Sequence, residues 1–400
     1  MKLTHLSITR RAFLAILLIG LAGCATNPNH VYLTWQGDPS TTMTVNFHST
    51  EAASDLTLHY DTESRGGEPG AYRYAASGAS RQIPGLKDER HIHHVEATEL
   101  EPGATYHFVL ADGSDVLTEE LRFRPLPGGN APLRFISGGD MAILPRSYQI
   151  ARLAGSYDPM FALIGGDMAY ADGKLKNAWM WDRWLDMWEE HMVTADGVMI
   201  PMVLAIGNHE VNKLEGPPEV RAPFYYGYFP QGGRSYFTLP LRDDTILIVL
   251  DSGHAVPHGG AQAEWLDEVL GASAGLRNTI AVYHAPLYPS HRDYEDGRAV
   301  EGRTHWLPIF DKHGLRVAFE NHDHTFKRTK VLRGGAVAES GTVYLGDGSM
   351  GVNPRPVQER WYLEKASGTP HFWLCEIDDT GMRFRAISAA EDLLDDLTLN

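Results

Sequence analysis

Seven residues of this sequence are of types whose side chains can bind metal ions, and they follow closely after short apolar runs. The runs span residues 133–137, 161–164, 202–206, 279–283 and 315–320, and each has the length and composition of a buried strand. The residues that follow carry two carboxylates, a phenol, an amide and three imidazoles, and they are Asp140, Asp167, Tyr170, Asn208, His284, His322 and His324. Because ligands of open α/β sheets lie beyond the carboxyl ends of the strands, we expect these side chains to converge on one edge of a sheet.

This mixed set of oxygen and nitrogen ligands suits Fe, Zn or Mn, and it contains no thiolate that would favour a soft metal. Seven side chains exceed the three or four that one zinc site takes, which favours two ions that share a bridging carboxylate. His322 and His324 are two residues apart, so a turn between them lets their rings diverge toward two ions. Any one of these residues alone would more often be a helix cap or a turn residue. The prediction rests on the occurrence of all seven after predicted strands.

Residues 1–23 have the composition of a secretion signal, with Lys2, Arg10 and Arg11 ahead of an apolar stretch too short to span a membrane as a mature helix. The following Leu-Ala-Gly-Cys24 resembles a bacterial lipobox, which implies cleavage before Cys24 and lipid attachment to its sulfur. The alternative is an ordinary signal peptide that ends near a cysteine. Residues 9–14 resemble a twin-arginine signal, and the export route stays open. We expect an exported bacterial lipoprotein, anchored to the membrane only through Cys24, with residues 24–30 as a tether.

The whole chain carries a formal charge of −16 at pH 7, which argues against a nucleic-acid-binding surface or an anionic membrane surface as a partner. Cys375 is the second of two cysteines, so with Cys24 lipidated no disulfide is expected. The 400 residues, 43% of them hydrophobic, suffice for a full core and for two domains.

Residues 31–126 are predicted to form an all-β domain. Apolar residues alternate with period two in runs that begin near Val31, Met43, Leu56, Val95 and Tyr106. With residues 72–74 and 121–123 these runs give seven short strands, the number of an immunoglobulin-like sandwich. Residues 100–106 resemble the strand-joining turn of fibronectin type III modules. His91 and His93 fall on one strand face and are interpreted as a surface pair, and residues 127–132 as a linker.

Residues 133–400 mix strands and helices. Helices are predicted at residues 175–191, 261–270 and 306–313, and further strands at 244–250, 342–345 and 372–387. In the first helix Trp181, Trp184, Leu185 and Trp188 recur at helical spacing, which favours packing in the core over a binding platform. The glycine-rich loop at residues 346–351 resembles a phosphate cradle in composition only, and it is interpreted as a turn because no helix follows.

The order of these motifs resembles that of the purple acid phosphatases, a family of dinuclear metallophosphoesterases with five motifs. Motifs two and three are intact at residues 166–170 and 207–210. Motifs one, four and five differ from the family pattern, but only at positions that do not supply a ligand. They read Gly139-Asp-Met-Ala142, Ala281-Val-Tyr-His284 and Asn321-His-Asp-His324. The resemblance covers about residues 30–390. It implies a fibronectin III-like N-terminal sandwich followed by a four-layer α/β metallophosphoesterase domain, in which helices flank two mixed sheets.

The resemblance also implies the roles of the ligands. Asp140, Asp167, Tyr170 and His324 would hold Fe(III), and Asp167, Asn208, His284 and His322 would hold a divalent ion, Zn, Fe or Mn. The tyrosinate would keep the iron oxidised and give a purple colour. The charge of two ions outweighs that of their ligands, so an acidic protein can still bind phosphate. The implied activity is hydrolysis of phosphate esters, of the acid phosphatase type, by attack of a metal-bound hydroxide on phosphorus.

Two histidines are candidates for protonating or stabilising the departing alkoxide. His209, beside Asn208, is the first, although it could instead support the ligands from outside. His291 is the second, because residues 288–297 resemble the substrate-facing loop of the family. Two other functions stay open: a phosphodiesterase or nucleotidase with a different metal pair, and an exported binding lipoprotein with a dead site. The complete ligand set argues against the dead site.

Overall fold

The computed structural model describes residues 30–400 with the exception of residues 51–54 and residue 89. The predicted leader and Cys24 lie outside the described residues. Within them, none of the helices has the length and apolar character needed to cross a membrane.

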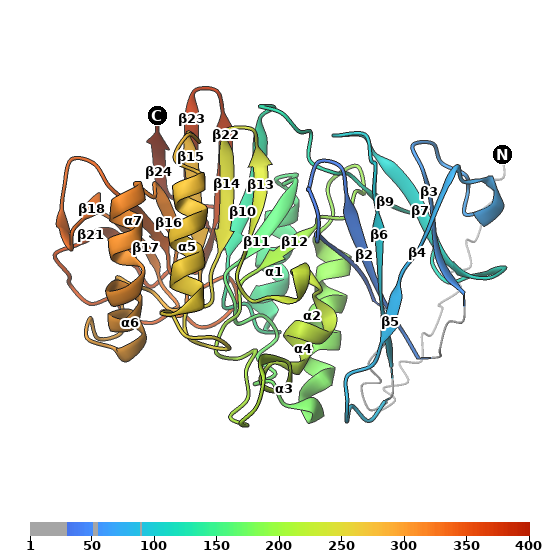
Figure 1. Ribbon diagram of the computed structural model, residues 1–400, viewed down its shortest axis with the longest axis horizontal. Coiled ribbons are helices and arrows are strands. Elements are labelled where there is room, and N and C mark those ends of the chain that lie inside the picture. Colours follow the sequence, from blue (N-terminus) through green and yellow to red (C-terminus); the bar gives the residue numbers. More distant parts are fainter. Residues whose placement is uncertain (1–29, 51–54, 89) are drawn as a thin grey trace, which may run out of the picture.

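The N-terminal part is a sandwich of two sheets, blue to cyan in Figure 1. One sheet has the order β1 (Val31–Thr34), β2 (Met43–Ser49), β6 (His91–Ala97), β5 (Ala79–Arg81). The other has the order β4 (Tyr74–Ser77), β3 (Leu56–Asp61), β7 (Tyr106–Asp112), β8 (Asp115–Val116), with β9 (Leu121–Phe123) paired to β7. Alternate residues such as Val45, Leu58 and Phe108 fill the space between the sheets, as the period-two pattern requires. The predicted all-β class is confirmed.

The sandwich differs from the sequence prediction in three details. Its described residues form nine strands and not seven, because β5 and β8 are short and exposed and lack the apolar pattern that predicted the others. Residues 72–74 were predicted as a strand, but β4 begins at Tyr74, after the 3-10 turn η1 (Pro69–Ala71). The surface interpretation of the His91 and His93 pair is wrong for His93, which is buried and lies 2.9 Å from the Ser49 hydroxyl.

The rest of the chain is built on two mixed sheets. In sheet 1 the order is β12 (Met202–Leu204), β11 (Phe161–Ile164), β10 (Leu133–Gly138), β22 (His371–Asp378), β23 (Gly381–Ser388), β24 (Leu393–Leu399). In sheet 2 it is β13 (Phe237–Arg242), β14 (Thr245–Val249), β15 (Asn278–Val282), β16 (Val317–Phe319), β20 (Val343–Gly346), β17 (Phe326–Thr329), β21 (Leu363–Ser367). A small hairpin pairs β18 (Leu332–Arg333) with β19 (Ala336–Val337). Strands β10 to β12 are parallel to one another, and so are β14, β15, β16 and β20.

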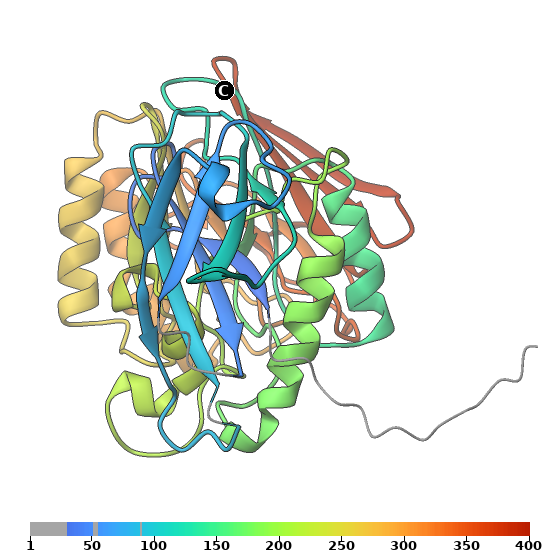
Figure 2. The ribbon, with the colours of Figure 1, turned by 90° about the vertical axis from the view of Figure 1, so that its right-hand side faces the viewer.

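Helices cover the outer face of each sheet, and Figure 2 shows them on opposite sides of the strands. Helices α1 (Pro145–Gly155) and α2 (Ala178–His191) cover sheet 1, and α5 (Ala261–Ala272), α6 (Gly297–His305) and α7 (Leu307–His313) cover sheet 2. In β11, Phe161 and Leu163 face the core between the sheets, whereas Ala162 and Ile164 face the helices. Both faces of the central strands are therefore buried, and the predicted four-layer α/β class is confirmed.

The tryptophan stripe belongs to the core, as its spacing predicted. Trp181, Trp184 and Trp188 are all buried, and Trp184 stacks on Trp188 with ring centroids 5.1 Å apart. The α-helix begins three residues later than predicted, at Ala178, because the 3-10 turn η2 (Leu175–Asn177) precedes it. The sequence analysis did not predict the helices α1, α6, α3 (Pro218–Arg221) and α4 (Pro223–Tyr228) or the turn η3 (Gln231–Gly233).

The sandwich packs against the α/β part through a buried charged pair. Arg90, which precedes β6, donates from Nη2 to Asp182 Oδ2 on α2 over 3.1 Å, and both side chains are almost fully buried. Tyr32 OH also donates to Tyr228 O over 2.7 Å. A buried charge that loses its partner lowers the stability of the fold. This pair therefore holds the sandwich in one position against α2.

Candidate metal centre

Backbone hydrogen bonds tie together the loops that follow β10 and β11. Gly165 N–H donates to Gly138 O over 2.7 Å, and Asp140 N–H donates to Gly166 O over 3.0 Å. The two strands are parallel neighbours, so these bonds continue their ladder beyond the strand ends. They place Asp140 next to Asp167 at the carboxyl end of sheet 1.

The loops that follow β15 and β16 are joined to each other and to sheet 1 by Asn321. Its N–H donates to His284 O over 2.9 Å, and its amide donates to Tyr283 O over 3.1 Å. A Cβ added to Gly165 would lie 1.8 Å from Asn321 Nδ2, so the close approach requires glycine in sheet 1. The departure from glycine in the fifth motif therefore places an amide side chain directly against Gly165 of the other sheet.

The seven predicted ligands come from the ends of two sheets and not from one sheet edge, which corrects the sequence expectation. The loops of β10, β11 and β12 carry four of them, and the loops of β15 and β16 carry three. The two sheets stack face to face with their parallel strand ends at the same end of the molecule. The side chains consequently meet between the sheets in two groups.

The first group contains Asp140, Tyr170 and His324 and is called here the Asp140 group. Tyr170 OH lies 3.2 Å from Asp140 Oδ1 and 3.3 Å from His324 Nε2. His324 Nε2 lies 3.0 Å from the same carboxylate oxygen. Three polar atoms from three loops thus surround one point.

The second group surrounds His284 Nε2 and is called the His284 group. This nitrogen lies 3.1 Å from Asp167 Oδ2, 3.2 Å from Asn208 Oδ1 and 3.1 Å from His322 Nδ1. Ligand atoms of Asp167, His284 and His322 all lie within 4.8 Å of one another, close enough to hold one cation. Asp167 follows Gly166 on the same loop as Tyr170, so this loop contributes to both groups.

Five of the seven candidates have a left-handed backbone that non-glycine residues rarely adopt. The φ angles are +54° for Asp140, +53° for Asp167, +62° for Tyr170, +78° for His322 and +59° for His324. Each costs of order 1 kcal/mol and persists only where the surroundings impose it. Strain concentrated on these residues supports a functional role for the two groups.

The donor atoms of the two groups fit a pair of cations. His284 Nδ1 donates to Gly165 O over 2.8 Å, so Nε2 is the ring nitrogen that faces Asp167 Oδ2 and would be available to a cation held beside that carboxylate. Within the described ranges, only histidines form ion pairs with Asp140 and Asp167, although both carboxylates are buried. Burial and the two carboxylates also raise the pKa of Tyr170 far above 10. Positive charge at these points would compensate the buried carboxylates and release the phenol proton.

The glycine-rich loop after β20 supports Asp140. A Cβ added to Gly348 would lie 1.8 Å from Asp140 Oδ2, the oxygen that also accepts the His322 N–H over 2.9 Å. Among the described residues no helix follows this loop, in agreement with the sequence interpretation, but sequence reasoning missed its contact with the candidate centre.

Gly348→Ala is expected to displace Asp140 and to lower metal content and activity together. Gly334→Ala is the matched control, because Gly334 has a similar φ of +60° but no heavy atom within 4 Å of an added Cβ, whereas Gly348 has φ +64°. The control should lose only about 1 kcal/mol of stability. Equal metal loss in both variants, measured by elemental analysis, would contradict the contact.

His209 and Glu210 lie directly beside the ligands. His209 stacks on Tyr170 with centroids 4.0 Å apart, and its Nδ1 lies 2.6 Å from Asp172 Oδ1. Glu210 is buried and accepts N–H groups of Asp167 and Gly207 over 2.7 and 2.8 Å. Burial and the neighbouring Asp167 raise the pKa of Glu210 to about 7. Glu210 therefore joins the Asp167 and Asn208 loops.

His291 lies outside the two groups. Its Nδ1 donates to Pro356 O over 2.7 Å, and its N–H donates to Asp323 Oδ2 over 2.7 Å. Asp323 stands between His322 and His324 in the chain, so His291 is linked to these ligands through a neighbour. Its catalytic role stays a prediction.

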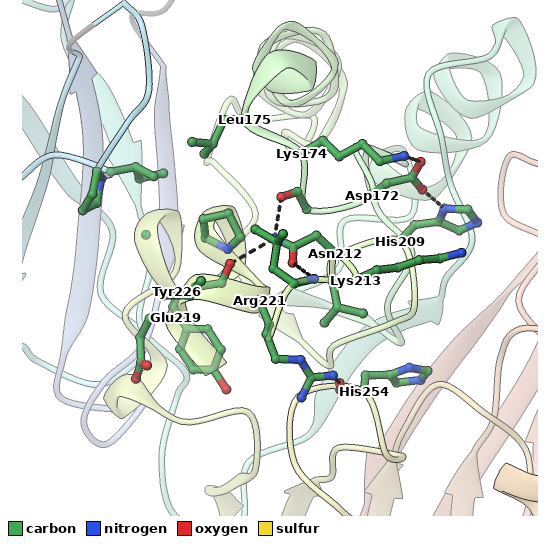
Figure 3. Close-up of a pocket in the computed structure, with 18 of the residues that line it drawn as sticks. Asp172, Lys174, Leu175, His209, Asn212, Lys213, Glu219, Arg221, Tyr226 and His254 are labelled. Carbon is green, nitrogen blue, oxygen red and sulfur yellow. Dashed lines mark hydrogen bonds and ion pairs between the residues drawn. The ribbon is translucent and has the colours of Figure 1, made fainter. Parts of the chain in front are cut away.

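A pocket of about 1300 Å³ opens beside the candidate centre. Figure 3 shows His209, Lys213 and His254 reaching toward one side of this pocket, with Glu219 and Tyr226 on the other. Asn208 also lines it, so the pocket is continuous with the His284 group. Sequence reasoning missed Asp172, Glu210, Asn321 and His254 as site residues. Asp172, Glu210 and Asn321 lie next to or within recognised motifs, whereas no local pattern marked His254.

Comparisons with known proteins cover both parts of the chain. The family model described as "Purple acid Phosphatase, N-terminal domain" matches residues 28–124, and the model described as "Calcineurin-like phosphoesterase" matches residues 142–326. An uncharacterized protein of Mycobacterium tuberculosis is 26% identical over 390 residues, which covers 85% of this chain and 68% of that protein. Purple acid phosphatase 13 of Arabidopsis thaliana is 22% identical over 67% of this chain and 55% of its own length.

Among solved structures, a purple acid phosphatase from yellow lupin (Lupinus luteus) seeds matches with a TM-score of 0.76 at 16% identity, over 93% of this chain and 74% of that chain. A structure of PhoD matches with a TM-score of 0.66 at 12% identity, over 92% and 88% of the two chains. At these identities the likeness shows the fold alone. The two family models, which match in this order along the sequence, show that the chain belongs to the purple acid phosphatase family of calcineurin-like phosphoesterases.

Proposed function

We propose that the protein hydrolyses phosphate esters, in the manner of an acid phosphatase, at a dinuclear centre of Fe(III) and a divalent ion. The observation that supports this most is the meeting of seven ligand side chains from five loops between two sheets. The Asp140 group would hold Fe(III), and the His284 group would hold Zn, Fe or Mn, with Asp167 shared. When bound, the ions supply positive charge for the phosphoryl oxygens and activate water for attack on phosphorus.

The protein's own residues would hold the ligands in position and supply the proton for the leaving group. Glu210 holds the Asp167 and Asn208 loops together, so that the ligands are in place before substrate arrives. Asp172 accepts a hydrogen bond from His209 Nδ1, which leaves Nε2 free at 3.9 Å from Asp167 Oδ2. In this orientation a protonated His209 presents its Nε2 proton to the departing alkoxide. We assign this role to His209 ahead of His291 because His209 contacts the ligands directly.

His209→Ala is expected to keep both metals and to lower kcat by about 10²- to 10⁴-fold, the range for a lost general acid. His313→Ala is the matched control, because His313 also lies 2.6 Å from an aspartate, Asp267, but outside the two groups. The measurement is metal content beside steady-state kinetics. Metal loss in step with activity would show that His209 only supports the ligands.

Tyr170→Phe is expected to retain iron but to lose the visible absorption band, because the phenolate is the group that would give the charge transfer. The absorption spectrum of the purified variant, recorded at equal iron content, is the measurement. An unchanged band would remove Tyr170 from the iron site.

Assays with paired aryl phosphate monoesters and diesters test the proposed activity itself. Faster hydrolysis of the monoester supports an acid phosphatase. Faster hydrolysis of the diester favours the second candidate, a phosphodiesterase or nucleotidase, to which the large pocket beside the centre gives room. A relative from Hordeum vulgare, 26% identical over 56% of this chain, is described as a nucleotide pyrophosphatase/phosphodiesterase. Absence of both activities in metal-loaded protein would leave a binding function.

We also propose that the protein is an exported lipoprotein. The proposal rests on the sequence before residue 30 and on Cys24. Labelling of the full chain with radioactive palmitate, and loss of the label in Cys24→Ala, is the expected result, whereas equal labelling of both would contradict it.

A further inference from the structure

The pocket beside the candidate centre is much larger than a phosphate group needs. Its volume of about 1300 Å³ exceeds the roughly 300–1,000 Å³ of typical small-molecule sites. Asn208 and His209 line it at the candidate centre, and Arg81, Ile83 and Pro84 of the N-terminal sandwich line it as well. The leaving group of a substrate whose phosphorus atom lies beside His209 would therefore extend into this pocket.

The walls of the pocket are mainly apolar and come from separate segments. Ile83 belongs to the sandwich, Leu175 to η2, and Leu214 and Val220 to the segment that runs from the third motif into α3. Leu214 is 62% exposed and Val220 is 46% exposed. Exposed apolar side chains gathered around one pocket are typical of a binding surface. Figure 3 shows Leu175 and Tyr226 on the side nearer the strands of the sandwich.

The segments around the pocket are held in place by polar contacts. Asn212 donates from Nδ2 to Gly173 O over 3.1 Å and to Val220 O over 2.9 Å. Arg221 donates to Ala255 O over 3.1 Å. These bonds fix the segment that carries Leu214, so the pocket is formed before a ligand arrives.

The charges of the pocket are opposite to that of the whole chain. Five cationic side chains line it against two carboxylates, namely Arg81, Lys174, Lys213, Arg221 and Arg298 against Asp172 and Glu219. Lys174 pairs with Asp172 over 2.9 Å, and Arg221 is engaged by backbone carbonyls. Within the described part of the chain, the side chains of Lys213 and Arg298 have neither an ion pair nor a hydrogen bond. These two cations are available to a ligand.

Arg298 and His254 both line the pocket. The His254 ring lies 5.3 Å from that of His284, a predicted ligand. Lys213 and His254 reach toward the same side of the pocket (Figure 3), so an anionic group bound there would lie close to the phosphoryl group that the centre cleaves.

We propose that this pocket binds the leaving group of the substrate, and that this leaving group combines an aromatic ring with at least one further negative charge. The inference rests on the proposed hydrolysis of phosphate esters at the adjoining centre. The ring lies against the apolar wall of Ile83, Leu175 and Leu214, and the additional charge lies at Lys213 and Arg298. The N-terminal sandwich thereby takes part in substrate selection.

Three substrates separate the two parts of this proposal. Release of the terminal phosphate of adenosine diphosphate leaves a group with both a ring and a charge. Adenosine monophosphate leaves the ring without the charge, and pyrophosphate leaves charge without the ring. The measurement is kcat/KM for each substrate with the metal-loaded full chain. The anhydride bonds of adenosine diphosphate and pyrophosphate break more readily than the ester bond of adenosine monophosphate, so the change of each ratio between wild type and variant decides.

Lys213→Glu is expected to lower the ratio of adenosine diphosphate to adenosine monophosphate by about tenfold, since an exposed attraction becomes a repulsion of similar size. Lys176→Glu is its control, because Lys176 is exposed on the neighbouring η2 but does not line the pocket. Leu214→Asp is expected to lower the ratio of adenosine diphosphate to pyrophosphate by about tenfold. Its control is Val337→Asp, at a residue 53% exposed on the remote β19.

The outcomes separate this inference from the proposed function. Hydrolysis of all three substrates with ratios unchanged in Lys213→Glu and Leu214→Asp would overturn the inference and leave the function standing. Equal losses for all substrates would also overturn it, because they would show a structural effect. Failure of the metal-loaded wild type to hydrolyse any of these substrates or simple aryl phosphates would refute both. Arg298→Glu and Val220→Asp repeat the test should a first variant fold poorly, as judged by circular dichroism.

Discussion

Asp167→Asn is expected to abolish hydrolysis of phosphate esters and to leave the protein with fewer than two bound ions. Asp167 is buried, its Oδ2 lies 3.1 Å from His284 Nε2, and its Oδ1 accepts the His209 N–H over 2.7 Å. Asparagine keeps the shape but removes the charge and one of the two acceptor oxygens. The loss should exceed the roughly 10–100-fold that follows from loss of an outer partner of a metal ligand.

Asp158→Asn is the matched control for this substitution. Asp158 precedes the strand β11 that Asp167 follows, its φ is also positive at +50°, and its Oδ1 accepts the Ala195 N–H over 2.7 Å. The same chemical change at the opposite end of one strand should leave metal content and kcat as in the wild type. Retention of two ions by Asp167→Asn would show that this carboxylate bridges nothing.

Lys327→Met is expected to cost about 3–5 kcal/mol of stability, the range for a buried ion pair that loses one partner. Lys327 is fully buried, and its Nζ lies 2.6 Å from Glu320 Oε2 and 3.1 Å from Asp347 Oδ2. The Asp347 and Glu320 carboxylates outweigh the effect of burial and raise the pKa of the Lys327 ammonium, so it is charged. Glu320 in turn accepts the Leu287 N–H over 2.7 Å, in the loop after His284.

The variant should therefore lose metal affinity along with stability, because the network stands behind the loops that carry His284 and His322. Lys312→Met is the control, since Lys312 lies 2.7 Å from Asp267 but is 60% exposed, and it should cost at most about 1 kcal/mol. Urea unfolding of both variants measures the difference. Equal losses of unfolding free energy in the two variants would mean that the buried network stabilises the fold no more than a surface ion pair does.

The seven candidate ligands could be selected from the sequence because the signals that mark them are local. An apolar run that ends in Gly-Asp or in Gly-Asn-His is visible without any knowledge of the fold, and the order of the five motifs identified the family. The division of the ligands between two sheets was not predictable in this way. It depends on pairings such as that of Phe135 with Cys375, which no local pattern encodes.

The supporting residues were harder to predict, because their roles come from contacts distant in the sequence. Asp182 lies among the polar residues of its helix, yet it is buried against Arg90 of the sandwich. Asn321 stands where the fifth motif of the family has glycine. Its structural role comes from its close contact with Gly165 of the other sheet. The pocket likewise combines residues from the sandwich and from the α/β part, so its lining follows only from how they pack.

X-ray diffraction from crystals of the full protein, collected on both sides of the iron absorption edge, tests most directly whether two ions are bound here. We expect two anomalous peaks that flank Asp167, one bounded by Asp140, Tyr170 and His324 with the iron signal, the other by Asn208, His284 and His322. An absence of peaks at these two points, with the seven side chains bonded to one another instead, would contradict the proposed metal centre and the hydrolysis derived from it.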